Sequence, residues 1–504
     1  MPPVVRSRLA PPKATAMIEA LRGLGYSTAT ALADIIDNSI SASASSVNVE
    51  FTWDGDHTRI TVLDDGHGMD EQELDRAMRL GERNPLDDRS PDDLGRFGLG
   101  LKTASFSQCR CLTVASRKGA SVSCLRWDLD VIAGSDDDGW YLLEGPSPGS
   151  EALLRVLAAA PGTLVVWERL DRVVTAGFTR QDFLDLIDGV ERHLAMVFHR
   201  YLEGLRPRLR LTINRTPVKP WDPFLLHHPT TWSSPVERFG SPPHTVEVQC
   251  HVLPHKDHLD PATIASAAGP DGWTAQQGFY VYRNARLLVA GSWLGLGQGR
   301  SWTKEEAHRL ARIRLDLPNS VDRDWKIDIR KSIARPPAAI RARLSRLAED
   351  TRRRARDVFA YRGQIVRTHA AGEVAQAWRA EHYRGGVRYC IDASHPAVKA
   401  VLEDAGILGP RIRAMLRIIE ETVPVQRIWL DTAEGRETPR VGFAEQSPAE
   451  IMAVLEVLYR NLVRRKGFSP VQAREQLLRT APFNDHPALV ASLPDDIASS
   501  ELSQ

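Results

Sequence analysis

Three short motifs that carry acidic residues, and in the second and third also glycines, lie between residues 31 and 105, and their order constrains the fold of this chain. The first lies in a segment whose apolar residues recur at helical spacing. The second ends a segment in which apolar and polar residues alternate, and the third opens another helical segment. Helices and a mixed sheet in one unit predict an α+β sandwich.

The first motif, ALADIIDNSISA, belongs to a helix predicted over residues 15–43. Asp34 and Asn38 are four positions apart and therefore share one face of this helix. A carboxylate and an amide at these positions suit the polarisation of a water molecule and the binding of Mg²⁺. An exposed polar stripe would give the same pattern, so this motif alone leaves both interpretations open.

The second motif is the strand end RITVLDDGHGMD. It places the carboxylate of Asp64 at the end of the strand, where it can accept a hydrogen bond from the exocyclic amine of adenine. Gly66 and Gly68 have no Cβ and would let the backbone approach a flat ligand. A tight turn with an incidental aspartate is the alternative interpretation.

The third motif, DLGRFGLGLKTAS, follows a polar segment with two prolines that is predicted to be a loop or lid. Gly95, Gly98 and Gly100 open a helix whose free N–H groups and positive dipole end can hold phosphates, and Lys102 adds a point charge. The spacing is not that of a Walker loop. No βαβ unit precedes it, which argues against a dinucleotide-binding fold.

Composition narrows the class of protein. Hydrophobic residues make up 42% of the 504 residues and charged residues 26%, as in folded globular proteins. Because 65 basic residues balance 64 acidic ones, any attraction to nucleic acid must come from a local patch. No apolar run approaches the ~20 residues of a membrane span, and the N-terminus lacks a secretory signal. Five cysteines exclude a disulfide framework, so we expect a cytoplasmic protein without membrane contact.

Prolines and changes in periodicity divide the chain into four predicted parts. They are an α/β domain at 14–205, a second β-rich domain at 206–335, an Arg-rich helical segment at 336–385 and a small α/β domain at 386–490. The last two form a mostly helical C-terminal region.

In this order the three motifs resemble those of the GHKL superfamily of ATPases (gyrase B, heat-shock-90, histidine kinase and MutL), whose α/β sandwich is also called the Bergerat fold. Gly162–Thr163 in PGTLVVWERL resembles the strand that closes the back of the nucleotide pocket in that family. The text GRFGLGLKTAS is most similar to the lid of the MORC branch and its prokaryotic relatives. The F-R-G-E-A core of MutL lids is absent from the sequence.

The resemblance implies a role for each matching residue. Asp34 stands at the position of the acidic general base, where most members have Glu, and Asn38 at that of the Mg²⁺ ligand. Asp64 stands at the position that reads adenine, and Thr163 at a water-mediated contact to the base. The other implied ATP-binding residues are Gly66, Gly68, Met69, Gly95, Arg96, Phe97, Gly98, Leu99, Gly100, Leu101, Lys102 and Thr103.

The β-rich second domain resembles the ribosomal-S5-like transducer domain that follows the ATPase domain in MORC-like proteins. Such domains lend a lysine that touches the γ-phosphate. DWKIDIRKS, predicted to be a strand, offers Lys326 and Lys331 on opposite faces, of which we favour Lys331. A solvated strand lysine is the alternative for each.

The Arg-rich segment is the best candidate for a local basic patch. Eleven arginines and four acidic residues lie between Arg335 and Ala380. Like charges crowded on a helix are costly unless an anion neutralises them, and DNA phosphate is a natural candidate. A solvated helical surface is the equal alternative. The arginines predicted to contact DNA are Arg352, Arg353, Arg354 and Arg356.

The sequence therefore predicts a MORC-like, Mg²⁺-dependent ATPase that hydrolyses ATP slowly to ADP and phosphate. The resemblance implies a homodimer that closes with ATP, and a DNA clamp in a prokaryotic restriction or other anti-invader (antiviral) defence system. Nuclease or helicase proteins are the candidate partners. A chaperone-like ATPase and a non-hydrolysing, ATP-gated scaffold acting on proteins are the alternatives.

Overall fold

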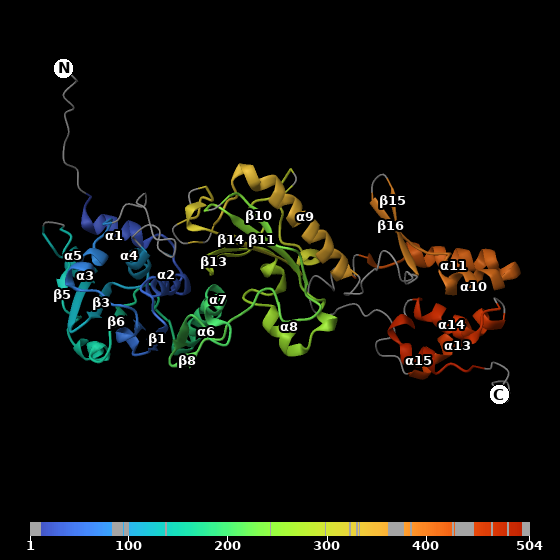
Figure 1. The fold of residues 1–504 in the computed structure, drawn as a ribbon, viewed down its shortest axis with the longest axis horizontal. Helices are drawn as coiled ribbons and strands as arrows, with labels where there is room; N and C mark the ends of the chain where they lie inside the picture. The colour runs from blue at the N-terminus through green and yellow to red at the C-terminus, as the bar shows by residue number, and fades with distance from the viewer. Residues whose placement is uncertain are drawn as a thin grey trace, which may run out of the picture. The chain divides into compact units, whose positions relative to one another are not determined.

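The computed structural model separates the chain into two compact units, Met1–Gly363 and Gln364–Gln504 (Figure 1). Within the described part of the chain, no helix is long and apolar enough to span a membrane. The described residues are 12–82, 94, 100–136, 139–241, 243–297, 299–321, 324–328, 331, 333–360, 377–383, 386–425, 428, 448–464, 467–480 and 483–495.

The first unit begins with an eight-stranded mixed sheet in the order β5-β4-β3-β6-β2-β1-β7-β8. Its neighbouring strands are antiparallel, except that β1 and β7 run parallel. The strands are β1 Ser46–Thr52, β2 Arg59–Asp64, β3 Cys111–Lys118, β4 Ser121–Asp128, β5 Leu143–Glu144, β6 Gly162–Glu168, β7 Arg210–Ile213 and β8 Thr216–Pro217.

Seven α-helices accompany this sheet, and together they form what we call the N-terminal domain. They are α1 Ala14–Arg22, α2 Thr28–Ser41, α3 Glu71–Met78, α4 Gly100–Phe106, α5 Leu129–Ala133, α6 Arg180–Val197 and α7 His199–Leu202, with 3₁₀ turns at Gly55–His57 and Glu151–Leu157. The sequence predicts one helix over residues 15–43, but the structure has two. The first ends at Arg22, and Gly25 takes a left-handed backbone (φ 74°) before Ser27 caps α2.

A second sheet, in the order β10-β11-β14-β12-β13, follows in the same unit, and β9 pairs with β11 beside it. We call this sheet, α9 and the segments that connect their elements the second domain. The strands are β9 Trp232–Ser233, β10 Glu237–Phe239, β11 Val246–Val252, β12 Gly278–Arg283, β13 Arg286–Ser292 and β14 Ala311–Leu317. The helices are α8 Pro261–Ala267 and α9 Ala338–Ala360, with 3₁₀ turns at Lys256–His258, Trp273–Gln276, Glu306–His308 and Asn319–Val321.

Two segments differ from the sequence prediction. The hairpin at 210–217 pairs with β1 and so extends the first sheet, although the sequence places it in the second domain. Helix α9 lies against β11 and β14 (Figure 1). Its residues Leu344, Ala348 and Ala355 are buried in the second core, so the Arg-rich segment contributes to that core. The helix predicted to reach residue 380 is described as far as Ala360; residues 361–376 lie outside the described residues, and Trp378–Tyr383 form a strand instead of a helix.

The second unit contains a two-stranded antiparallel hairpin and mostly helices. Its elements are β15 Trp378–Tyr383, β16 Gly386–Ile391, α10 Pro396–Asp404, α11 Gly409–Glu421, α13 Pro448–Arg464, α14 Pro470–Leu478 and α15 Pro487–Ala491, with 3₁₀ turns at Gly406–Leu408 and Phe483–Asp485. Leu455, Tyr459 and Leu477 form the centre of a small core. The α+β class and the helical C-terminal region predicted from the sequence are confirmed.

Candidate functional site

Four charged side chains meet beside α2, and we call them the aspartate cluster: Asp34, Asp37, Arg286 and Lys331. The ammonium of Lys331 donates hydrogen bonds to Asp34 Oδ1 at 2.8 Å and to Asp37 Oδ2. The Nε of Arg286 lies 3.2 Å from both carboxylate oxygens of Asp37. Two carboxylates thus face two cations, so the cluster as a whole carries no net charge.

The cluster is buried between α2 and the second domain. Because an unpaired charge is costly in a buried position, each charge of the cluster faces an opposite charge. Asp37 is 1% exposed, and Asp34 and Arg286 are also buried. Burial raises the pKa of Asp37, but the positive charges of Arg286 and Lys331 outweigh this effect and hold that pKa below its usual range. Burial and the charge of Asp34 raise the pKa of Tyr26, so its neutral hydroxyl donates to Asp34 Oδ2 at 3.1 Å.

Lys331, rather than Lys326, is the lysine that reaches the cluster. Lys326 is exposed in a turn, and no strand is present among the described residues from 324 to 335. Residues 324–326 form a turn in which Lys326 has a left-handed backbone (φ 47°), so the extended conformation of a strand is interrupted there. Lys331 is 8% exposed and has a left-handed backbone (φ 55°), which costs about 1–2 kcal/mol for a residue with a side chain. Lys326 shares this left-handed conformation, so burial and hydrogen bonding, and not backbone strain, distinguish Lys331 from Lys326.

Asn38 and Ser39 extend the site along α2. Asn38 is exposed to solvent, one residue beyond the buried Asp37. The hydroxyl of Ser39 donates to Asp64 Oδ2 at 2.8 Å, so α2 is joined to the end of β2. Helix α2 therefore carries Asp34 and Asn38 of the first motif, and through Ser39 it is bonded to Asp64 of the second motif.

Asp64 accepts three hydrogen bonds from protein groups. Besides Ser39, the backbone N–H groups of Gly66 and Thr163 donate to Oδ1 at 3.0 and 3.2 Å. Burial raises the pKa of Asp64 although these three bonds oppose it. A carboxylate has about four acceptor positions, so one remains for a ligand donor such as an amine.

The two glycines after Asp64 have a role that the sequence did not predict. A Cβ on Gly68 would lie 1.8 Å from the carbonyl oxygen of Arg117 in β3, and one on Gly66 would lie 2.9 Å from Ala42. The glycines therefore allow this loop to pack against the protein's own backbone. The sequence also did not predict a role for Ser116. Its hydroxyl is hydrogen-bonded to the hydroxyl of Thr163 at 2.9 Å and accepts a hydrogen bond from the N–H of Met69 at 2.9 Å.

The third motif reaches the cluster at the start of α4. A Cβ on Gly100 would lie 3.7 Å from Asp34 Oδ2, and the side chain of Thr103 shares a hydrogen bond with Tyr26. Leu101 is half-buried beside them. The predicted loop residues Gly95, Arg96, Phe97, Gly98 and Leu99 lie outside the described residues.

Lys102 is placed differently from the sequence prediction. Its side chain is buried, and its ammonium donates to the carbonyl oxygen of Ala77 near the end of α3 at 2.8 Å. In this arrangement Lys102 joins α4 to α3, and its charge is directed at a backbone carbonyl. The cation beside Asp34 comes instead from Lys331.

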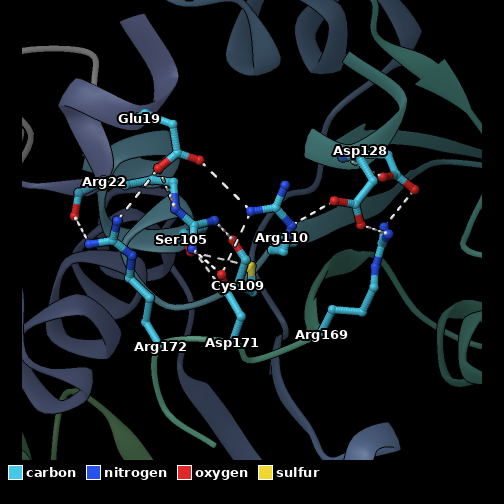
Figure 2. A network of polar contacts seen from close by, with 10 residues as sticks. Glu19, Arg22, Ser105, Cys109, Arg110, Asp128, Arg169, Asp171 and Arg172 are labelled. Carbon is cyan, nitrogen blue, oxygen red and sulfur yellow. Dashed lines mark hydrogen bonds and ion pairs between the residues drawn. The ribbon is translucent and has the colours of Figure 1, made fainter. Parts of the chain in front are cut away.

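A network of ion pairs fixes α1, which precedes the site, to the rest of the N-terminal domain (Figure 2). Arg22 at the end of α1 is buried and donates to Asp171 at 2.6–2.7 Å and to the carbonyl oxygen of Cys109 at 3.1 Å. The thiol of Cys109 in turn donates to the carbonyl oxygen of Ser105 in α4. The other labelled members are Glu19, Arg110, Asp128, Arg169 and Arg172.

The four arginines predicted to contact DNA do not share one face of α9. Arg352 is 9% exposed and lies 4.8 Å from the rings of both Trp293 and Trp302. It is therefore held within the second domain by cation–π contacts, which the sequence did not predict. Arg353, Arg354 and Arg356 are exposed, and Arg354 lies over Trp232.

Comparison with known proteins assigns the N-terminal domain. A family model described as histidine kinase-, DNA gyrase B- and HSP90-like ATPase matches residues 26–155, which include Asp34, Asn38 and Asp64. The chain carries a GHKL ATPase domain. The GHKL domain thus contributes two aspartates to the cluster, and the second domain contributes the two cations.

Two curated relatives agree with this assignment. The DNA mismatch repair protein MutL of Rhodospirillum rubrum is 32% identical over 108 residues, which are 21% of this chain and 17% of the relative. ATPase morc-1 of Caenorhabditis elegans is 25% identical over 232 residues, or 38% of this chain and 27% of the relative. The match thus spans about a sixth of the length of the MutL relative and about a quarter of the length of the MORC relative. The predicted resemblance to the GHKL superfamily, near the MORC-like proteins, is confirmed for the N-terminal part of the chain.

The described residues offer a candidate ligand for a magnesium ion that arrives with a nucleotide. No group of three or more His, Cys, Asp or Glu side chains that could hold a metal is found among the residues described above. Mg²⁺ usually keeps several waters and takes few protein ligands together with phosphate oxygens. The exposed amide of Asn38 could supply one such ligand.

Proposed function

We propose that this protein binds Mg-ATP in the GHKL domain and hydrolyses it slowly to ADP and phosphate. The observation that carries the proposal is the aspartate cluster, where Lys331 of the second domain lies 2.8 Å from Asp34 of α2. In this proposal Asp64 and Thr163 hold adenine, Asn38 ligates Mg²⁺ and the glycine-rich loop before α4 binds the phosphates. Asp34 accepts a proton from the attacking water, and the hydroxyl of Tyr26 helps to orient the Asp34 carboxylate for this step.

The second domain acts in this proposal as a transducer, resembling the S5-like domain of MORC-like proteins. Its core is continuous with α9, and its contact to the nucleotide site is made by Lys331 and Arg286. When Lys331 leaves Asp34 for a γ-phosphate, the second domain becomes bonded to the nucleotide. ATP binding would in this way alter the surface that both domains offer to a second copy.

We expect a homodimer with a non-hydrolysable ATP analogue and a monomer with ADP or without nucleotide. Because only the ATP-bound form pairs well in this proposal, mass action couples nucleotide binding to dimerisation. Light scattering at several protein concentrations measures the mass in each state. The same mass in all three states would contradict ATP-gated dimerisation. It would not test ATP binding, which calorimetry measures separately.

We further propose that the dimer clamps DNA, as in the MORC-like resemblance, with the exposed arginines of α9 contacting phosphates. Replacing Arg353, Arg354 and Arg356 with Gln should flatten the log–log salt dependence of DNA binding by about 0.9 for each phosphate that the variant no longer neutralises. Arg352 is kept, because it is buried against Trp293 and Trp302. Fluorescence anisotropy with duplex DNA at several salt concentrations measures the slope.

A second triple variant, which loses the same number of positive charges elsewhere, is the control for this DNA experiment. Arg206, Arg208 and Arg210 are exposed and lie in the N-terminal domain, so replacing them with Gln should leave the slope unchanged. An unchanged slope in the α9 variant, or an equal flattening in both, would contradict a DNA site on α9. The role in anti-invader defence, with a nuclease or helicase partner, rests on the MORC-like resemblance alone.

One observation favours a second candidate, the non-hydrolysing ATP-gated scaffold. Asp34 is one methylene shorter than the Glu of most relatives and is already bonded to Lys331 and Tyr26. A chain that binds ATP with no turnover above that of the buffer would support the scaffold instead of the ATPase. The chaperone-like alternative has no comparable structural support.

A further inference from the structure

Asp37 is held by two cations that reach it from different parts of the second domain. Arg286 begins β13, and Lys331 lies in the segment that precedes α9. Both approach a carboxylate that is 1% exposed. A buried carboxylate that loses its only positive partner is strongly disfavoured, so the number of partners matters.

The two cations differ in how firmly they are fixed. Arg286 uses its Nε for Asp37 and donates from a terminal nitrogen to the carbonyl oxygen of Leu287 at 2.7 Å. A planar guanidinium with several bonded donors is pre-organised. Lys331 has a compact ammonium on a flexible stem, which suits a group that changes partners.

The turn that carries Arg286 is itself fixed to the N-terminal domain. Tyr201 donates to the carbonyl oxygen of Asn284 at 2.5 Å, and Arg283 donates to the carbonyl oxygen of Leu94 beside the glycine-rich loop. Asn284 and Ala285 both have positive φ angles, as in a tight two-residue hairpin turn. The hairpin thus holds Arg286 against Asp37 without any help from Lys331.

We propose that Arg286 is a positioning residue that keeps Asp37 neutralised. Lys331 can then leave Asp34 and Asp37 and bind the γ-phosphate of ATP. The inference rests on the proposed ATP binding and adds a residue that touches neither nucleotide nor metal. Without Arg286, departure of Lys331 would leave Asp37 buried and unpaired, so Lys331 would stay with Asp37. ATP would then bind more weakly, whereas the chemistry of a bound ATP would change little.

Arg286→Gln tests this inference through the separate effects on KM and kcat. We expect the KM for ATP and the Kd of a non-hydrolysable analogue to rise about tenfold, with kcat within about threefold of the parent. Adding Asp37→Asn, which removes the carboxylate that needs neutralising, should restore the Kd to within about threefold of the parent. Thermal unfolding of each variant reports whether it is folded.

Lys331 provides a readout that a merely structural role would not change. In a Lys331→Gln background there is no ammonium to release, so adding Arg286→Gln should change the Kd by less than about twofold. If the Lys331→Gln/Arg286→Gln variant does not fold, the test is the recovery of ATP affinity in Asp37→Asn/Arg286→Gln. That variant has no unpaired carboxylate at position 37. Arg200→Gln is the matched control: Arg200 pairs with Asp316 across the same two domains, and its removal should leave KM unchanged.

The outcomes separate this inference from the proposed function. A parent protein that binds ATP, together with an Arg286→Gln variant of unchanged Kd, overturns the role of Arg286 alone. Equal decreases in kcat and affinity without recovery in the double variant overturn it as well. A parent that binds no ATP by calorimetry overturns both proposals.

Discussion

Asp34→Asn should bind ATP with an affinity close to that of the parent and hydrolyse it at least about 100-fold more slowly. An amide of the same shape can still accept from Tyr26, whose hydroxyl lies 3.1 Å from Asp34 Oδ2. It cannot accept the proton of the attacking water at neutral pH. Calorimetry with a non-hydrolysable analogue and steady-state phosphate release measure the two effects separately.

Asp34→Glu is the companion variant, because it restores the longer side chain that most GHKL relatives have. A faster Asp34→Glu enzyme would indicate that the short carboxylate limits the parent. The buried start of α4 lies close by, with the Gly100 position 3.7 Å from Asp34 Oδ2, so the added methylene has to be accommodated there. Hydrolysis at the parental rate by Asp34→Asn would remove Asp34 from the role of general base.

Asp64→Asn should lower the affinity for ATP by about tenfold or more without lowering the melting temperature. An amide can accept from the N–H groups of Gly66 and Thr163, and its NH₂ group can donate to Ser39. The carboxylate can accept a hydrogen bond from the amine of adenine. At the same position the amide would present a second donor, so the hydrogen bond to adenine would be lost. Calorimetry and thermal unfolding at neutral pH measure the two results.

The sign of the stability effect follows from the pKa of Asp64. Burial raises this pKa above that of an unfolded chain, so the folded protein holds the proton more tightly. The contribution of Asp64 to stability therefore falls as the pH rises through the unfolded and folded pKa values. At neutral pH the ionised form costs stability, and an uncharged amide removes that cost.

Asp65→Asn is the matched control, since Asp65 is the next residue and an acid of the same size. Its carboxylate accepts from the hydroxyl of Ser45 at 2.6 Å and from the N–H groups of Ser45 and Ser46 at 2.8 Å. Burial opposes these bonds, but they hold its pKa below the usual range, so Asp65 stabilises the fold above the unfolded pKa. We expect Asp65→Asn to lower the melting temperature and to leave ATP affinity unchanged. Unchanged affinity in Asp64→Asn would remove Asp64 from the pocket.

Much of the N-terminal domain could be predicted from local patterns in the sequence. The alternation in RITVLDDG corresponds to β2 and places Asp64 at its end, and the helical spacing around Asp34 corresponds to α2. The break at Gly25 was missed, because apolar spacing continues across it. Periodicity reports which face of an element is buried and does not report how far the element extends.

The partners of the charged side chains could not be predicted in the same way. Asp37 was visible in the first motif, but its partners lie 249 and 294 positions further along the chain, at Arg286 and Lys331. Lys102 sits beside the glycines of the third motif, yet its ammonium is bonded to Ala77. A charged side chain next to a motif is free to turn toward whichever partner the packing of other elements supplies.

The sequence by itself therefore determined the order of the motifs, the fold class and the resemblance of the N-terminal domain to the GHKL superfamily. Only the tertiary structure decided that Lys331 meets Asp34, that Arg286 holds Asp37 and that Arg352 lies against two tryptophans. The physical reason lies in the range of the interactions. Apolar periodicity and glycine placement act within a few residues, whereas the pairing of buried charges depends on which distant segments are packed together.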